Sequence, residues 1–210
     1  MNFAQKIAKE STITFSGMVY GNINRYLYLA LLARWVGVEY LGIYSIANAI
    51  MLIGEVIARM GLDTGIMRFV SRLDLKTEKS QIQKIIQSSL KMTGIFSIVI
   101  AIILVGLSWL LVSFFNGTPL LHIAIIVFAF TIPFNAITLV SAFATQGFKL
   151  LKYKVFTTQF INPMVLLGSM MISYWIFSKE SVIILPIAVT GVLGSIIMFL
   201  MLKNISGVKL

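Results

Sequence analysis

The segment MTGIFSIVIAIILVGLSWLLVSFF, residues 92–115, is apolar over its whole length and contains no charged side chain. A helix rises 1.5 Å per residue, so about 20 apolar residues span the roughly 30 Å hydrocarbon core of a bilayer. A transmembrane β-strand would instead be about ten residues of alternating polarity. The segment therefore predicts a membrane-spanning helix.

The rest of the chain has the same character. Hydrophobic residues make up 59% of its 210 residues, charged residues make up 11%, and the mean hydropathy is +0.96. Soluble domains are roughly half apolar and a quarter charged. We therefore expect an all-α integral membrane protein, a single six-helix transmembrane lobe over residues 1–210. The predicted spans are residues 12–35, 41–60, 92–115, 120–143, 156–177 and 182–202.

Basic residues are distributed unevenly between the two sides that six spans define. If the N-terminus is cytoplasmic, the inner segments hold most of the 17 Lys and Arg residues, whereas the outer connections hold only Arg34 and Lys179. Cytoplasmic loops carry such an excess. We expect a multi-pass protein of the cell membrane with both termini in the cytoplasm. The net charge of +10 would then face anionic membrane lipid rather than nucleic acid, since no soluble domain remains to bind nucleic acid.

The sequence also argues against several other classes of protein. The apolar run after residues 1–11 is too long for a cleaved signal peptide and lacks a small-residue cleavage site. The chain has no Cys, and its single histidine, His122, is expected to be an interfacial side chain. Paired carboxylates, metal-ligand clusters and nucleophile constellations are missing from the sequence. We therefore expect neither an enzyme nor a cofactor, and the identity of any coupling ion stays open.

Two ionisable residues lie well inside predicted spans, away from their ends. Arg25 is in the middle of the first, and Glu55 is the one acidic residue within any span. An ionised side chain at bilayer depth costs about 2.5 to 3.5 kcal/mol on insertion scales. Such residues usually face the interior of a helix bundle or a water-filled pathway. Arg25 and Glu55 therefore predict a transport cavity.

Helical projection supports this interpretation. At about 100° per residue, small and polar residues share one face of the first two predicted helices. In the first they are Thr14, Gly17, Tyr20, Gly21, Asn24, Arg25 and Tyr28, and in the second Ser45, Asn48, Glu55 and Arg59. The alternative is a purely structural ion pair, either between Arg25 and Glu55 or between Glu55 and Arg59 one turn further on.

Milder polar stripes follow in later spans. One comprises Thr131, Asn135, Thr138 and Ala142 near Pro133, and a looser one comprises Gln159, Asn162, Ser169 and Ser173 near Pro163. Proline commonly bends a helix, which suits a bundle that rearranges. Ordinary hydrogen bonding between helices explains such stripes as well. We take Asn135 and Asn162 as candidate cavity residues together with Arg25, Asn24, Tyr28, Asn48 and Glu55.

Two connections carry their own helical pattern. Residues 61–91 place Ile82, Ile85 and Ile86 opposite Lys79 and Lys84, which predicts an amphipathic helix on the cytoplasmic membrane surface that runs into the third span. Residues 145–154, TQGFKLLKYK, repeat the pattern in shorter form. A solvated, lipid-attracted face without a ligand accounts for both connections.

Three stretches together resemble a known family. They are ARWVGVEYLGIYSIANAI (residues 33–50), GLDTGIMRFVSR (residues 61–72) and FATQGFKLLKYKVFTTQFINP (residues 143–163). They resemble the N-terminal lobe of the Wzx-type polysaccharide (O-antigen) flippases, which belong to the multidrug/oligosaccharidyl-lipid/polysaccharide exporter superfamily. The resemblance implies export of lipid-linked oligosaccharide or polysaccharide repeat units, through a basic cavity between two lobes. It also implies that Arg25 meets the diphosphate or acidic sugars of the substrate.

The chain is short for that family, whose members have about 12 to 14 helices in two lobes. Six spans make one lobe, so we expect either a second lobe as partner or a homodimer. Two other functions stay open. One is a cation-coupled multidrug exporter of the same superfamily, which would need a cavity carboxylate such as Glu55. The other is a truncated, non-transporting lobe that acts as a membrane interaction protein.

Overall fold

The structure, a computed structural model, describes residues 3–73, 77–115, 117–177 and 179–206. Every element in this part of the chain is helical, which confirms the predicted all-α membrane bundle. The elements are α1 (Phe3–Trp35), α2 (Val38–Arg59), α3 (Leu62–Arg72), α4 (Lys79–Phe114), α5 (Pro119–Gly147), α6 (Leu151–Val155), the π-helix η1 (Phe156–Ile161), α7 (Asn162–Ile176) and α8 (Ser181–Ser206).

Five helical segments in the described ranges are long and apolar enough to cross a membrane. They are Val38–Arg59, Lys79–Phe114, Pro119–Gly147, Leu151–Ile176 and Ser181–Ile205. The 33 residues of α1 reach about 50 Å, so this helix is long enough as well. Asn22, Asn24 and Arg25 lower the hydropathy of its middle. The chain is thus a multi-pass membrane protein in which α1 is the most polar of the long helices.

Several helices extend past the predicted spans. α4 begins at Lys79 rather than at residue 92, and α5 continues to Gly147 rather than ending at residue 143. The apolar pattern reports only the part of a helix that lies in hydrocarbon, whereas the helix itself continues for as long as its backbone hydrogen bonds do.

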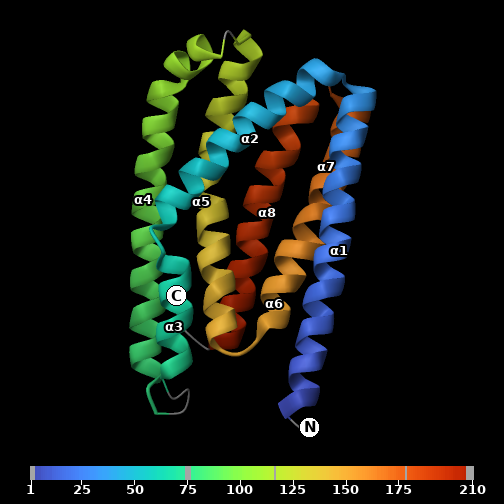
Figure 1. Ribbon diagram of the computed structural model, residues 1–210. Coiled ribbons are helices and arrows are strands. Elements are labelled where there is room, and N and C mark those ends of the chain that lie inside the picture. Colours follow the sequence, from blue (N-terminus) through green and yellow to red (C-terminus); the bar gives the residue numbers. More distant parts are fainter. Residues whose placement is uncertain (1–2, 74–76, 116, 178, 207–210) are drawn as a thin grey trace.

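α5 lies at the centre of the bundle (Figure 1). It packs against α4, α8, α2 and α3, whereas α1 packs against α7, η1, α6 and α2. Helices in a membrane approach closely where their contact faces are small. The small buried residues of α5 include Ala124, Ala129, Ala136, Ala142, Ala144 and Gly147. The bundle therefore has a well-packed side around α5 and a separate outer wall made by α1.

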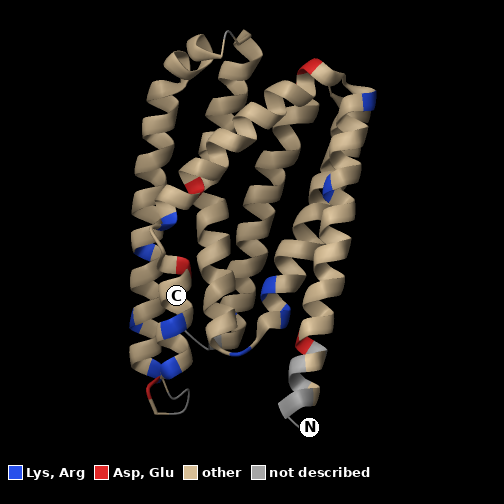
Figure 2. Cartoon of the chain, in the orientation of Figure 1, with Lys and Arg blue, Asp and Glu red and all other residues tan. Residues whose placement is uncertain are grey.

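The connections divide between the two ends of the bundle (Figure 1). The α1–α2, α4–α5 and α7–α8 connections lie at one end. The N-terminal end of α1, the α5–α6 connection and the end of α8 lie at the other, and Lys and Arg residues gather toward it (Figure 2). We call this second end the basic end. Its position agrees with the alternation of sides that the sequence predicts.

The connection after α2 matches the prediction in part: α4 runs without a break from Lys79 into the third span, but the apolar face of the connection does not lie on the membrane surface. Met60 (φ 46°) and Gly61 (φ 78°) adopt left-handed backbone, and the chain turns there into α3. The apolar residues of α3 and of the first turns of α4 pack against the end of α5 in one buried cluster: Ile66, Val70, Ile82, Ile86, Val140 and Ala144. The amphipathic face is thus covered by protein rather than lipid, because α5 extends far enough to meet it.

The outer surface of α4 is apolar. Its exposed side chains include Ile95, Ile98, Ile102, Trp109, Leu110 and Phe114. A soluble protein rarely exposes so long an apolar surface. In a bilayer, the same surface faces acyl chains, and the backbone polar groups are satisfied within the helix.

Gly147 allows α3 to approach α5. A Cβ at this position would lie 2.9 Å from Val70 Cβ and 3.1 Å from the Met67 carbonyl oxygen. Gly147→Ala should therefore lower the thermal unfolding midpoint of the purified protein, because overpacking costs about 1–3 kcal/mol. Gly94→Ala is the matched control, since a Cβ there meets nothing within 4 Å. Equal midpoints for the two variants would show that α3 and α5 leave room for a methyl group at position 147.

The orientation of the bundle can be tested with introduced cysteines, because the chain has none of its own. Lys79 lies at the start of α4, and Lys179 lies in the α7–α8 connection. The positive-inside pattern predicts that a membrane-impermeant thiol reagent labels Lys179→Cys in intact cells and Lys79→Cys only after permeabilisation. The reverse labelling would place the basic end outside.

Candidate functional site

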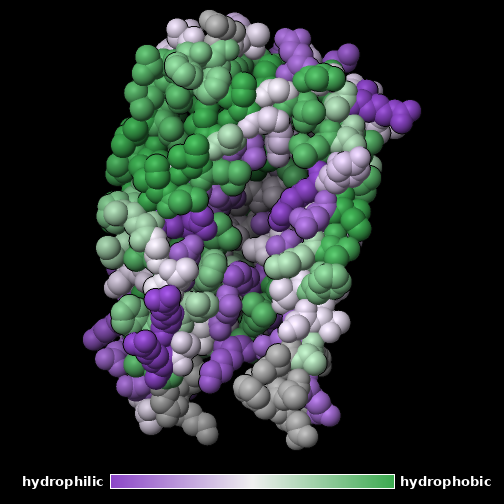
Figure 3. Space-filling model, in the orientation of Figure 1, coloured by the Kyte–Doolittle hydropathy of each residue, from purple (hydrophilic) through white to green (hydrophobic). Residues whose placement is uncertain are grey.

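A cavity of about 620 Å³ opens on one face of the bundle. Figure 3 shows this face hollowed along its middle, with hydrophilic residues on both sides of the hollow. The lining comes from α1, α2, α5, η1, α7 and α8, so segments from both halves of the chain meet there. Its polar side chains outside the tyrosines are Arg25, Ser45, Asn48, Glu55, Asn135, Thr138, Thr158, Asn162 and Thr190.

The structure brings six of the seven candidate residues to this cavity. Arg25 and Tyr28 reach it from α1, Asn48 and Glu55 from α2, Asn135 from α5 and Asn162 from α7. Asn24 does not line it, because its amide nitrogen donates a hydrogen bond to the Tyr20 carbonyl oxygen within α1, at 2.8 Å. Helical projection placed Asn24 on the same face of α1 as Arg25 but could not show that it bonds to its own helix.

Arg25 is the basic residue of the cavity lining. Its side chain is exposed, and its Nη2 lies 3.5 Å from Oε1 of Gln159 in η1. Among the described residues, the one salt bridge is between Arg59 and Asp63. The guanidinium of Arg25 is therefore in contact with a neutral amide rather than with a carboxylate.

Glu55 forms neither of the two ion pairs that the sequence allowed. Its side chain is only 4% exposed, and its Oε1 accepts a hydrogen bond from Asn135 Nδ2 at 2.7 Å. Arg59 donates from Nε to the Glu55 backbone carbonyl, at 3.1 Å, and its guanidinium pairs with Asp63 in α3 at 3.3 Å. Neither the Arg25–Glu55 pair nor the Glu55–Arg59 side-chain pair forms, because each arginine has a closer partner on another element or turn.

Aromatic contacts close the cavity toward the α1–α2 connection. Tyr28 packs against Tyr44, with ring centroids 5.3 Å apart, and Tyr44 packs edge-on against Phe128 at 5.8 Å. Trp35 at the end of α1 stacks on Tyr174 of α7 at 4.9 Å. The Tyr28 hydroxyl is buried and has no hydrogen-bond partner in the described structure. These rings join α1, α2, α5 and α7 at the end opposite the basic end.

Small residues of α8 let two asparagines approach closely. A Cβ on Gly194 would lie 2.7 Å from Asn162 Oδ1, and a Cβ on Gly191 would lie 3.3 Å from Asn135 Oδ1. Asn162 Oδ1 is buried without a partner among the described residues. An unpartnered amide oxygen next to a cavity is an acceptor that a ligand or water can use.

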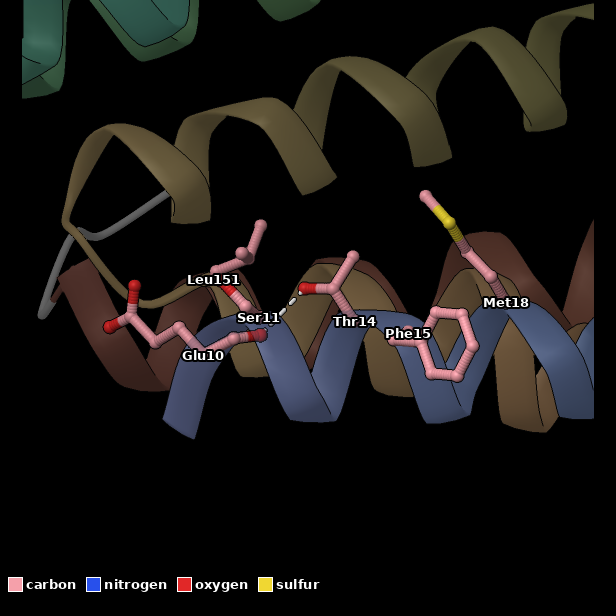
Figure 4. Close-up of a pocket in the computed structure, with 6 residues that line it drawn as sticks. All are labelled: Glu10, Ser11, Thr14, Phe15, Met18 and Leu151. Atoms are coloured by element: carbon pink, nitrogen blue, oxygen red, sulfur yellow. Dashed lines mark hydrogen bonds between the residues drawn. The ribbon is translucent and has the colours of Figure 1, made fainter. Parts of the chain in front are cut away.

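A second pocket of about 430 Å³ lies along the N-terminal half of α1 (Figure 4). It is lined by Glu10, Ser11, Thr14, Phe15, Met18 and Leu151. Figure 4 shows the Thr14 and Met18 side chains directed toward the neighbouring helices, and Thr14 Oγ1 donates to the Glu10 carbonyl at 2.8 Å. Thr14, Met18 and Arg25 recur at helical spacing, so the pocket and the cavity lie along the same side of α1.

Other cavity residues were missed or weakly indicated in the sequence. Nothing in the sequence pattern marked Thr158 and Thr190 as cavity residues, and Gln159, which bonds to Arg25 but does not line the cavity, belongs only to a loose polar stripe. Among the described residues, no cluster of three His, Cys, Asp or Glu side chains could hold a metal ion. The chemistry that the cavity offers is one guanidinium, one carboxyl and several neutral amides and hydroxyls.

A membrane-embedded helical bundle with a polar cavity of this composition fits a transporter rather than an enzyme. The family model described as polysaccharide biosynthesis protein matches residues 7–207. The chain therefore belongs to the polysaccharide biosynthesis protein family, which includes polysaccharide flippases, and the predicted membership is confirmed. No curated protein and no solved structure matches the chain significantly.

Proposed function

We propose that this chain forms one lobe of a flippase that moves lipid-linked oligosaccharide or polysaccharide repeat units across the cytoplasmic membrane. The observation that carries the proposal is Arg25, a guanidinium on the wall of an intramembrane cavity whose hydrogen bond goes to a neutral amide. The family match supports a role in polysaccharide transport.

Arg25 suits a phosphate-linked substrate. A diphosphate cannot cross hydrocarbon unaided, so a carrier needs a fixed cation at depth in the membrane. A guanidinium keeps its charge at physiological pH and offers paired donors to phosphate oxygens. Because Arg25 has no carboxylate partner among the described residues, an anion would not have to displace one.

The remaining cavity surface suits sugars. Asn48, Asn135, Asn162, Thr158 and Thr190 present neutral amide and hydroxyl groups. Such groups can donate and accept hydrogen bonds with the hydroxyls of a glycan. The tyrosines Tyr28 and Tyr44 add apolar ring surface with polar edges.

The proposal includes a partner for the open face. An exposed arginine is costly when it faces lipid. Arg25 lines the cavity that opens on one face of the bundle, so we propose that a second lobe or a second copy of the chain covers this face in the membrane. Alternating access would then move the two lobes around the shared cavity.

A cation-coupled exporter is the second candidate, and Glu55 favours it. Glu55 is the carboxylate of the cavity lining, and its side chain bonds to an amide rather than to a cation. A transporter that exchanges its substrate for a cation needs a group of this kind. The two candidates differ in which residue transport depends on.

Arg25→Ala should abolish export of the lipid-linked glycan in cells that hold the complete assembly, while membrane insertion stays intact. Arg25→Lys should keep part of the activity, because the charge survives but the bidentate geometry does not. Arg34→Ala is the control, since Arg34 is an exposed arginine in the last turn of the same helix. Normal export by Arg25→Ala at a normal protein level would contradict the proposal.

Glu55→Gln separates the two candidates. The glutamine oxygen can still accept the hydrogen bond from Asn135, so the protein level should be normal. A flippase that relies on Arg25 should keep most of its transport, whereas a cation-coupled exporter should lose it. Glu55→Ala removes the acceptor and should lower the free energy of unfolding by about 1–3 kcal/mol. If Glu55→Gln loses transport while Arg25→Ala keeps it, the result favours the exporter.

A further inference from the structure

The fifth span contains a widened helical turn. Residues 156–161 form the π-helix η1 between α6 and α7. Pro163, near the start of α7, supplies a physical cause, because proline lacks the N–H that would bond to the carbonyl four residues earlier, and its ring collides with that carbonyl. The residue four positions before Pro163 is Gln159. A π turn carries the backbone past this conflict, and such turns are frequent at functional sites.

α1 packs closely on this widened turn through two glycines. A Cβ on Gly17 would lie 2.5 Å from Val155 Cγ1, at the end of α6, and 3.2 Å from Phe160 Cε2 in η1. A Cβ on Gly21 would lie 2.5 Å from Gln159 Oε1 and 3.1 Å from the Gln159 carbonyl oxygen. Tyr20, on the same side of α1, stacks on Phe160 at 4.9 Å. The Gly17-x-x-x-Gly21 motif is thus the contact surface for η1, and Gly21 leaves room for the Gln159 side chain.

Gln159 reaches past Gly21 to Arg25, which lies one helical turn further along α1. Its Oε1 is the hydrogen-bond acceptor that the structure gives to the Arg25 guanidinium, at 3.5 Å from Nη2. A neutral acceptor orients a guanidinium without neutralising it. A carboxylate in the same place would compete with an anionic ligand for the same donors.

We propose that Gln159 is a positioning residue for Arg25, and that the π turn of η1 and the glycines of α1 exist to place it there. The inference rests on the proposed role of Arg25 in binding the phosphate group. Gln159 holds the guanidinium on the cavity side of α1 while it leaves the positive charge available. In a regular α-helix, without the extra residue of the π turn, Gln159 would be rotated by about 100° around the helix axis. Its side chain would then point away from Gly21.

The test measures binding of geranylgeranyl diphosphate to the purified protein, in detergent, together with any lobe that copurifies. Geranylgeraniol is the uncharged reference ligand. The variants are Gln159→Met, which keeps an unbranched side chain of similar length, Gln159→Glu, Arg25→Ala and the double variant Arg25→Ala with Gln159→Met. Gln146→Leu is the control, because Gln146 bonds to Lys154 instead and does not line the cavity.

Gln159→Met should weaken diphosphate binding by about 2- to 10-fold, which is the usual range for one hydrogen bond. Gln159→Glu should weaken it further, to the level of Arg25→Ala, because the new carboxylate pairs with the guanidinium. Gln159→Met should have no added effect in the Arg25→Ala background. Geranylgeraniol binding should stay unchanged in all variants, and Gln146→Leu should match the wild type.

The outcomes separate the inference from the proposed function. If Arg25→Ala binds the diphosphate as the wild type does, the proposed function fails. If Arg25→Ala loses binding while Gln159→Met and Gln159→Glu keep it, the positioning role is wrong and the proposed function stands. A further loss caused by Gln159→Met in the Arg25→Ala background would also overturn the positioning role, since Gln159 would then act independently of Arg25.

Discussion

Hydrocarbon offers no hydrogen-bond partner, so each polar group inside the bundle has to be satisfied by the protein or by a water-filled cavity. Most hydroxyls meet this requirement within their own helix. Ser45, Thr138 and Thr190 each donate to the carbonyl four residues earlier, at 2.6–2.8 Å. A guanidinium or a carboxyl group cannot be satisfied in this way, because it carries more donors or acceptors and a charge. Arg25 and Glu55 therefore require partners on other elements and a polar space between the helices, and the cavity supplies both.

This requirement explains why the two sides of the bundle differ. Around α5, small and apolar residues fill much of the interior, among them the buried side chains of Ile125, Phe128 and Ile132. α1 instead rests on η1 through glycines and carries its polar residues along the hollow side. The side around α5 thus holds most of the buried apolar residues, and the side toward α1 holds the open cavity.

The sequence predicted an all-α membrane bundle, since about 20 consecutive apolar residues are a strong signal. Five described helices are long and apolar enough to cross a membrane, and α1, which contains the first predicted span, is not among them. The sequence also placed six candidate residues on faces that meet in one cavity, because helical periodicity fixes the side of a helix. It could not predict which polar groups would be partners. The Arg25–Glu55 pair fails because periodicity gives the angle around a helix but not the depth at which two helices cross. The 61–91 connection turned out to be covered by α5, because an amphipathic pattern does not show whether protein or lipid lies against it. An effect of Pro163 on the helix was expected, whereas the π turn before it and its close contact with Gly17 and Gly21 of α1 appear only in the fold.

The two ionisable side chains that sequence analysis placed in the cavity, Arg25 and Glu55, are attached to different parts of the bundle. Glu55 bonds to Asn135 and so joins α2 to α5, whereas Arg25 bonds to Gln159 and so joins α1 to η1. Between α1 and α2 lie only Val36 and Gly37, and Gly37 has a φ of 124°, which other residues rarely adopt. The interaction between two charges falls as their separation grows and as water enters between them. Because each charged group is held by a neutral amide on its own side, the guanidinium is not neutralised by a direct ion pair. An anion that enters this cavity therefore meets a positive charge that is already oriented, and it does not first have to break a salt bridge.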